Sequence, residues 1–353
     1  MGNLVHAAFV GERGLRAGWS LLLGLVLYKL FLLVLGSIAV TLYPALTTMV
    51  FSPTPAIVSE GVALLAALGA VLVVARIEER PLLDYNLRAP HRVKRFFTGA
   101  GIGFLSLSLL VFCMMAGGWV RFGPMELTAG QIAAYAVLWA IAFLLTGLVE
   151  EGMFRCFALF TLARGINFWW AFLAVSVVCM RLLLTEPHAN GAWGVYLVGM
   201  LGLVPCMAMH HMHSSRAGFW QAAWVTSTAF GFWHTSNLGE NGVGIFAAAL
   251  IGFVFCVSVR VTGSAWWAIG CHAAWDWAET FFYGTADSGF APQGHLLTSL
   301  PVGNPLMNGG SNGPEGSVLV APVLVVMLAF LLLFYRRRRP AAAPAPTPVR
   351  SVL

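Results

Sequence analysis

Ten stretches of the sequence are apolar over enough residues to cross a lipid bilayer, and this leaves few folds open to the chain. A transmembrane helix needs about 20 mostly apolar residues, because the hydrocarbon core is about 30 Å thick and a helix rises about 1.5 Å per residue. The predicted spans are about 18 to 43, 56 to 76, 97 to 119, 130 to 163, 167 to 184, 193 to 212, 218 to 236, 242 to 261, 264 to 283 and 317 to 335. We therefore predict an all-α, polytopic transmembrane helical bundle of about 8 to 10 spans.

The composition agrees with this fold class and limits the partners. The chain is 59% hydrophobic and 10% charged, which does not describe a soluble domain with a water-facing surface. A net charge of +6 would suggest nucleic acid in a soluble protein, but the basic residues lie mostly in loops and in the tail, where they set topology. We therefore expect the lipid bilayer as a partner and no nucleic acid. The six cysteines lie in apolar runs without a C-x-x-C motif, so they indicate neither disulfides nor a cysteine zinc site.

The distribution of lysine and arginine predicts the topology. Basic residues are concentrated in the loop at 76 to 95 and in the run at 336 to 339, so both should be cytoplasmic by the positive-inside rule. The long loop at 284 to 316 contains no lysine or arginine and is rich in turn residues, which suits an external segment. With ten spans, both termini would be cytoplasmic. We predict a multi-pass protein of the cell (inner or plasma) membrane.

Two adjacent carboxylates and a guanidinium interrupt the fourth apolar stretch at Glu150, Glu151 and Arg155. A charge at bilayer depth costs at least about 2.5 to 3.5 kcal/mol on insertion scales, so such a cluster is a functional-site hypothesis. On a helix, Glu151 and Arg155 lie four residues apart on one face, while Glu150 points about 100° away. We predict that Glu151 pairs with Arg155 and that Glu150 is left free for chemistry. The alternative is a purely structural ion triad.

Two later apolar spans carry histidines in short patterns. His234 lies one turn after Phe230, and His272 lies on the same helical face as Asp276. Together with Glu150, these groups could activate a water and stabilise an oxyanion. Glu150, His234 and His272 could equally be three zinc ligands with an open fourth position. The absence of an H-E-x-x-H zinc helix favours the water-activating glutamate.

The three motifs Glu-Glu-x-x-x-Arg, Phe-x-x-x-His and His-x-x-x-Asp follow one another on successive apolar spans. In this order they resemble the CPBP family of membrane proteases, which includes the type II CAAX prenyl endopeptidases and bacteriocin-processing or self-immunity proteins. The segment at 262 to 270, which precedes His272, also resembles the lead-in common in that family. The resemblance covers residues from about 130 to 280.

The resemblance implies an intramembrane endopeptidase that cleaves a membrane-associated peptide or protein of the CAAX type, prenylated or not. It implies that Glu150, helped by His234, activates the water. Glu151 and Arg155 would hold the geometry of the site, and His272 with Asp276 would contact the oxyanion or position the imidazole that does. No cofactor is required as the first choice, and zinc is the alternative.

One departure from the family pattern bears on the substrate. Asp276 stands where the prenyl-endopeptidase branch has asparagine, and an ionised aspartate cannot donate a hydrogen bond to an oxyanion. This difference favours a role for Asp276 in orienting His272 and weakens the case for prenylated substrates. The competing functions are a non-catalytic membrane scaffold or immunity protein and, with less support, an ion-coupled transporter.

These observations predict the organisation of the chain. The spacing between Arg155 and His234 is longer than the compact family arrangement needs, which suggests an inserted helical hairpin. The predicted parts are N-terminal transmembrane helices at 1–129, a catalytic membrane domain at 130–283 with the hairpin at about 165–215, an extracytoplasmic loop at 284–316, a last transmembrane helix at 317–339, and a disordered Pro/Ala-rich tail at 340–353.

Overall fold

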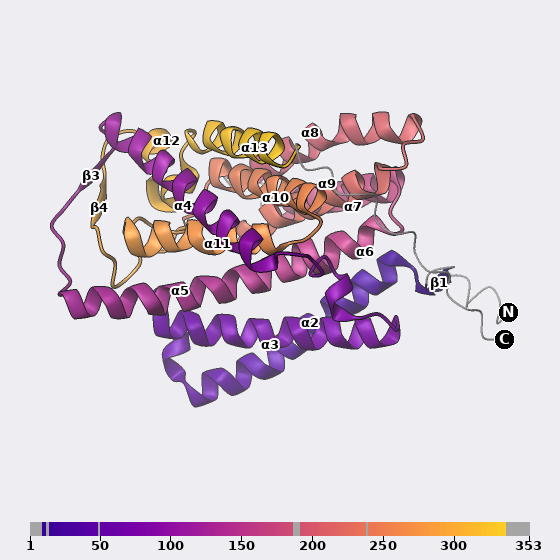
Figure 1. Cartoon of the computed structure of the whole chain (residues 1–353), viewed down its shortest axis with the longest axis horizontal. Coiled ribbons are helices and arrows are strands. Elements are labelled where there is room, and N and C mark those ends of the chain that lie inside the picture. Colours follow the sequence, from indigo (N-terminus) through magenta and orange to yellow (C-terminus); the bar gives the residue numbers. More distant parts are fainter. Residues whose placement is uncertain (1–8, 12–13, 49, 186–190, 238, 337–353) are drawn as a thin grey trace.

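The ten segments predicted to span the membrane are helical in the computed structural model (Figure 1). The structure describes residues 9–11, 14–48, 50–185, 191–237 and 239–336. The helices in these segments are α2 (Ala17–Leu42), α3 (Pro53–Ile77), α4 (Arg92–Ala116), α5 (Ala129–Glu151), α6 (Leu159–Ala163), α7 (Phe168–Thr185), α8 (Ala192–His211), α9 (Ala217–His234), α10 (Gly242–Thr262), α11 (Trp266–Trp277) and α13 (Val320–Arg336). The predicted tail at 340–353 and the basic residues at 337–339 lie outside the described residues.

Seven helices among the described residues are long and apolar enough to cross a membrane, with α5 and α6 counted as the single helix Ala129–Ala163. The predicted all-α polytopic bundle is therefore confirmed, and the chain is a multi-pass membrane protein. The helices α9, α11 and α13 occupy the other three predicted spans. The pair α7 and α8 lies where an inserted hairpin was expected, and its status as an insertion stays a prediction, as does the division into domains.

Strands are few and short among the described residues. The strands β1 (Val10–Gly11) and β2 (Gly14–Leu15) pair antiparallel near the start of the chain. The strands β3 (Val120–Phe122) and β4 (Ser299–Pro301) also pair antiparallel, with Arg121 opposite Leu300. The second pair ties the α4–α5 connection to the long loop before α13, which also contains α12 (Pro305–Asn308).

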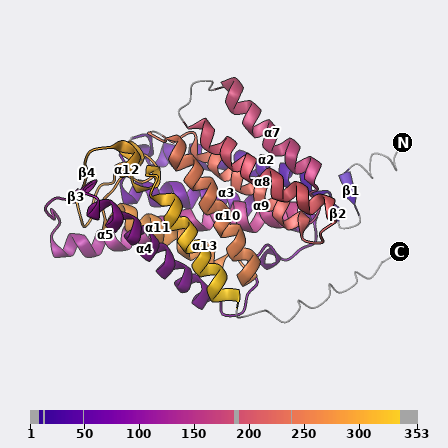
Figure 2. The same cartoon turned by 90° about the horizontal axis from the view of Figure 1, so that it is seen from above.

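The helices that carry the predicted site residues lie in the middle of the bundle. In Figure 1, α2 and α3 lie on one side of α5, while α11, α10 and α13 lie on the other. Figure 2 shows α4, α13 and α10 side by side over the same part of the molecule, with α7 at its edge. The helix α11 packs against both α4 and α5. The end of α5 is thus enclosed by helices from both halves of the chain.

Glycines allow α11 to approach α4 at backbone distance. A side chain at Gly99 would collide with the carbonyl oxygen of Trp267, and one at Gly103 would collide with that of Cys271. This spacing is the small-xxx-small pattern that lets transmembrane helices approach closely. On the α5 side, a Cβ at Gly147 would come 3.1 Å from the carbonyl oxygen of Ile269. Small residues on two helices therefore fix the position of α11.

A second anchor joins the N-terminal hairpin to the end of α6. Glu78, just after α3, accepts hydrogen bonds from Ser20 of α2 at 2.6 Å and from Arg164 at 2.9 Å. Arg80 adds an ion pair at 3.4 Å, and Tyr85 donates to the same carboxylate at 3.3 Å. Burial alone would raise the pKa of Glu78, but the bonds from Arg164 and Ser20 and the charges of Arg164 and Arg80 lower it overall.

Replacing Gly103 by valine should separate α4 from α11. The added side chain meets backbone atoms, which cannot rotate away, so we expect a loss of about 1 to 3 kcal/mol of stability. The measurement is the unfolding temperature of the detergent-purified protein. Gly101→Val is the matched control, because nothing lies within 4 Å of a Cβ at Gly101. Equal unfolding temperatures for the two variants would contradict the assigned helix contact.

The Glu78 anchor should make stability depend on pH. Because its pKa is lowered in the folded protein, its contribution is complete above the unfolded value near 4.5 and is lost as the pH falls through the folded value. At neutral pH, Glu78→Gln should cost on the order of 2 kcal/mol. The difference from wild type should shrink in thermal unfolding below about pH 4.5. Glu79→Gln, at the exposed neighbouring residue, is the control; a pH-independent difference for Glu78→Gln would refute this assignment.

Candidate active site

Four of the six predicted site residues line one cavity of about 390 Å³, namely Glu150, His234, His272 and Asp276. Glu150 lies near the end of α5, His234 at the end of α9, and the other two on α11. The other two predicted residues, Glu151 and Arg155, are fully buried beside this cavity. The structure therefore brings together residues from the three predicted motifs.

The ion pair predicted between Glu151 and Arg155 is present. Arg155 Nε lies 3.2 Å from Glu151 Oε2, and Arg155 Nη1 donates to Glu151 Oε1 at 3.3 Å. The guanidinium also lies 4.2 Å from the centre of the Phe230 ring, a cation–π contact. Gly252 leaves room for it, since a Cβ there would come within 2.6 Å of Arg155 Nη2. Residues of α5, α9 and α10 thus surround the buried charge of Arg155.

A π-helical segment follows the two glutamates. The chain changes from α-helix to π-helix over Gly152–Ala158 and returns to α-helix in α6. Such segments are rare and often occur at functional sites, because some of their backbone carbonyl and N–H groups fall outside the regular hydrogen-bond pattern of the α-helix. Here Asn86 Nδ2 donates to the carbonyl oxygen of Arg155 at 2.7 Å. The backbone nitrogen of Ala265 donates in turn to the Asn86 carbonyl at 2.8 Å, so the basic loop at 76 to 95 joins the end of α5 to the start of α11.

His272 is surrounded by carboxylates. Its Nδ1 lies 3.0 Å from Glu151 Oε1, and its Nε2 lies 3.4 Å from Asp276 Oδ2 and 3.8 Å from Glu150 Oε2. The predicted contact between Asp276 and His272 is therefore present. The partner on the opposite nitrogen is Glu151, which sequence reasoning had assigned only to Arg155. Glu151 thus bridges the guanidinium and the imidazole.

The neighbouring carboxylate of Glu150 has a different environment. Its side chain is 21% exposed, whereas that of Glu151 is 0% exposed. Glu150 Oε2 has no hydrogen-bond partner, although it is buried from solvent. His272 Nε2 lies 3.8 Å from it. Glu151 Oε2 also lacks a hydrogen-bond donor, but it lies 3.2 Å from Arg155 Nε, so Glu151 is held in an ion pair while the preceding Glu150 is available at the cavity.

His234 shares the cavity and has a defined tautomer. Its Nδ1 lies 2.8 Å from the carbonyl oxygen of Phe230. Because a carbonyl can only accept, Nδ1 carries a proton, and in the neutral ring Nε2 is the acceptor. Among the described residues, no hydrogen bond joins His234 to Glu150, so the expected cooperation between them rests on their shared cavity.

The zinc alternative stays a prediction, because His234 and His272 each keep Nε2 as a potential ligand. Nδ1 of His234 faces a backbone carbonyl and Nδ1 of His272 faces Glu151, and zinc-bound histidines commonly have such partners on their other nitrogen. Among the described residues, the side chains at metal-binding spacing are Glu279, Asp287 and Glu315. This group does not include Glu150, His234 or His272. We therefore derive no catalytic step through a metal.

Sequence reasoning missed Glu60, Asn237, Asp287 and Glu315, which also line the cavity. Glu60 carried a usable signal, because it is a carboxylate within the predicted span at 56 to 76. Asp287 and Glu315 lie in the long loop, where an acidic residue is unremarkable in sequence. The fold alone brings these loop residues to the cavity.

The comparisons with known proteins agree with the predicted resemblance. Residues 206–278 match the family model described as type II CAAX prenyl endopeptidase Rce1-like. This segment contains α9 to α11 and thus His234, His272 and Asp276. The match confirms the resemblance and supports, as a general class, a membrane endopeptidase of the CAAX-protease type. No curated protein and no solved structure matches the chain.

The adjacent glutamates should respond differently to the same substitution. Glu151→Gln leaves Arg155 as a buried charge without its counter-ion, which typically costs about 3 to 5 kcal/mol. Glu150→Gln removes no ion pair with arginine and should leave the unfolding temperature close to that of wild type. The measurement is thermal unfolding in detergent, with Glu150→Gln as the matched control. Equal destabilisation by both changes would refute the structural division between them.

Proposed function

We propose that this chain is an intramembrane endopeptidase in which Glu150, assisted by His234, activates a water molecule for attack on a peptide carbonyl. The observation that carries this proposal is the unequal environment of two adjacent carboxylates. Glu151 is fully buried and lies within 3.3 Å of both Arg155 and His272, whereas Glu150 lines the cavity and has only His272, at 3.8 Å, as an ion-pair partner among the described residues.

The proposed reaction needs one base and a site for the developing negative charge. Glu150 accepts a proton from water as the oxygen attacks the carbonyl carbon, and the proton passes to the leaving amine when the C–N bond breaks. His234 Nε2 is the second acceptor that orients the water. His272, whose Nδ1 is held by Glu151, supplies its Nε2–H and its positive charge beside the oxyanion. Glu151, Arg155 and Asp276 act by positioning that imidazole.

The cavity suits a peptide presented from the bilayer. Aromatic side chains of Phe51, Phe143, Phe230 and Phe255 line it together with the polar residues. A mixed lining of this kind binds apolar side chains while a few polar groups fix the scissile bond. We propose a membrane-associated peptide or protein as the substrate, with CAAX-type sequences as the first class to test. The proposed location is the cell membrane, with both termini cytoplasmic because of the basic loop at 76 to 95.

The test is cleavage of a quenched peptide library, prenylated and unprenylated, by detergent-purified protein. Glu150→Gln should lower the turnover rate by at least about 100-fold, because a general base contributes 10² to 10⁴. His234→Ala and His272→Ala should also lower it while the proteins stay folded. Glu126→Gln, at an exposed carboxylate, should cleave like wild type.

A transition-metal chelator, 1,10-phenanthroline, separates the two catalytic types. Cleavage that persists in its presence supports the glutamate-activated water, and cleavage lost to it supports a zinc enzyme. If folded wild type cleaves no peptide of the library, the proposal fails in favour of a non-catalytic scaffold.

A further inference from the structure

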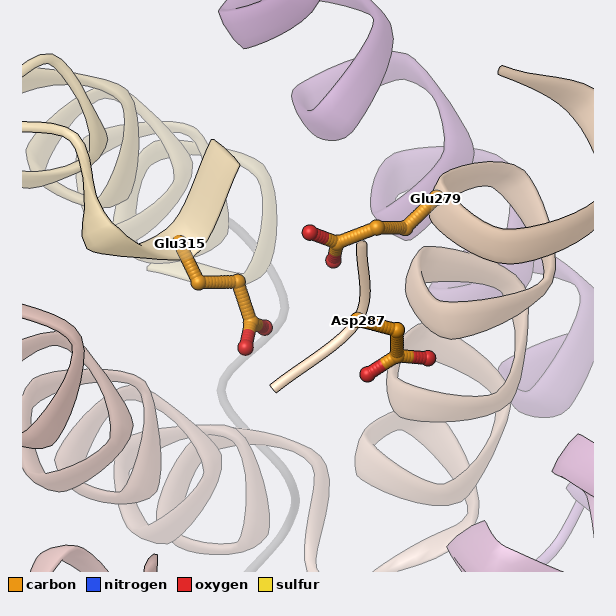
Figure 3. Close-up of side chains that lie close together, drawn as sticks. All are labelled: Glu279, Asp287 and Glu315. Atoms are coloured by element: carbon orange, nitrogen blue, oxygen red, sulfur yellow. The ribbon is translucent and has the colours of Figure 1, made fainter. Parts of the chain in front are cut away.

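Three carboxylates outside the proposed catalytic group converge beside the cavity (Figure 3). Glu279 lies in the π-helix Ala278–Phe282 that continues α11, Asp287 follows in the loop, and Glu315 lies in the short 3-10 helix Pro314–Gly316. One oxygen from each residue lies within 4.8 Å of the others. We call these three residues the acidic triad. The fold brings them together from three separate segments, so their proximity is not a consequence of local sequence.

One oxygen of the acidic triad has no hydrogen-bond partner among the residues that the structure describes. Glu279 is fully buried, and its Oε1 has no hydrogen-bond donor, while its Oε2 accepts from Trp275 Nε1 at 3.2 Å. Figure 3 shows this carboxylate pointing toward the other two. A buried carboxylate oxygen without a donor is costly, because it has lost its water and gained nothing in exchange. This oxygen therefore points to a ligand at the centre of the triad.

Within the described part of the chain, the donors to the triad are all neutral. Trp275 Nε1 donates to Glu315 at 2.9 Å, Ser288 donates to Glu315 at 3.1 Å, and Thr280 donates to Asp287 at 2.7 Å. Among the described residues, no lysine, arginine or histidine forms an ion pair with any of the three carboxylates. Like charges this close repel each other, and neutral donors do not remove the excess charge. A cation would.

We propose that Glu279, Asp287 and Glu315 bind one hard divalent cation. An all-oxygen set of carboxylates matches calcium or magnesium and not the softer transition metals. Calcium is favoured, because it tolerates irregular geometry and a variable number of oxygen ligands, whereas magnesium demands a near-ideal octahedron. The unpartnered Glu279 Oε1 becomes a ligand, and Asp287 and Glu315 bring the loop to the ion.

The site would fix the long loop over the active-site cavity. Asp287 and Glu315 line the cavity that contains Glu150 and His272, and Glu279 follows Asp276 by one turn. A cation at the triad would therefore join the loop to the end of α11. This role is structural and uses none of the residues proposed to activate the water.

The test uses the full chain in detergent after removal of divalent cations with EDTA. Calcium chloride is titrated by isothermal calorimetry, and the unfolding temperature is measured with calcium, with magnesium and with neither. We expect one calcium per chain and a higher unfolding temperature in calcium, since a ligand that binds only the folded state stabilises it. Glu279→Gln should weaken calcium binding at least tenfold, and Asp287→Asn provides a second variant if Glu279→Gln does not fold.

Two controls make the outcome specific to the triad. Glu126→Gln, at an exposed carboxylate elsewhere, should bind calcium like wild type. Glu150→Gln should also bind like wild type, so loss of catalysis and loss of the cation site are separate results. The proposal is overturned if wild type binds neither calcium nor magnesium, or if Glu279→Gln and Asp287→Asn bind calcium as tightly as wild type.

Discussion

The buried ion pair between Glu151 and Arg155 is the interaction on which the rest of the site depends. A guanidinium inside an apolar bundle needs a counter-ion and a space cut for it, and this chain provides Glu151, the faces of aromatic rings, and the missing side chain of Gly252. The same carboxylate also contacts His272 Nδ1, so Glu151 holds both the guanidinium and the imidazole in place. The neighbouring Glu150, one residue earlier and about 100° away on the helix, is then the carboxylate that faces the cavity.

The rest of the bundle positions this pair relative to the histidines. The glycines of α4 and α5 let α11 approach at backbone distance and bring His272 to Glu151 across the bundle. Asn86 binds the Arg155 carbonyl within the π-helix, so a loop outside the apolar spans holds the irregular turn in place. The helix α3 contributes Glu60 to the cavity wall, and phenylalanine rings line the same cavity. In this account, packing supplies the rigidity that chemistry at Glu150 requires.

Much of this arrangement could be predicted from sequence, because it depends on local periodicity. The apolar runs predict the spans, and the four-residue spacings of Glu151 with Arg155 and of His272 with Asp276 predict contacts along one helix face. The contact between Glu151 and His272 joins residues 121 apart and depends on how closely α11 approaches α5. The acidic triad depends on the path of a loop, and no periodicity encodes such a path. The π-helix was also outside sequence reasoning, because residues 152 to 158 are as apolar as a regular helix would be.

The central claim is that water held by Glu150 attacks the substrate directly. The most direct measurement is a single-turnover cleavage of a substrate peptide in water enriched in oxygen-18, with the product and the enzyme examined by mass spectrometry. The account predicts one oxygen-18 atom in the new carboxylate of the product after the first turnover and none in the side chain of Glu150. Unlabelled product together with label in Glu150 would show that the glutamate itself attacks the carbonyl, and it would contradict the account.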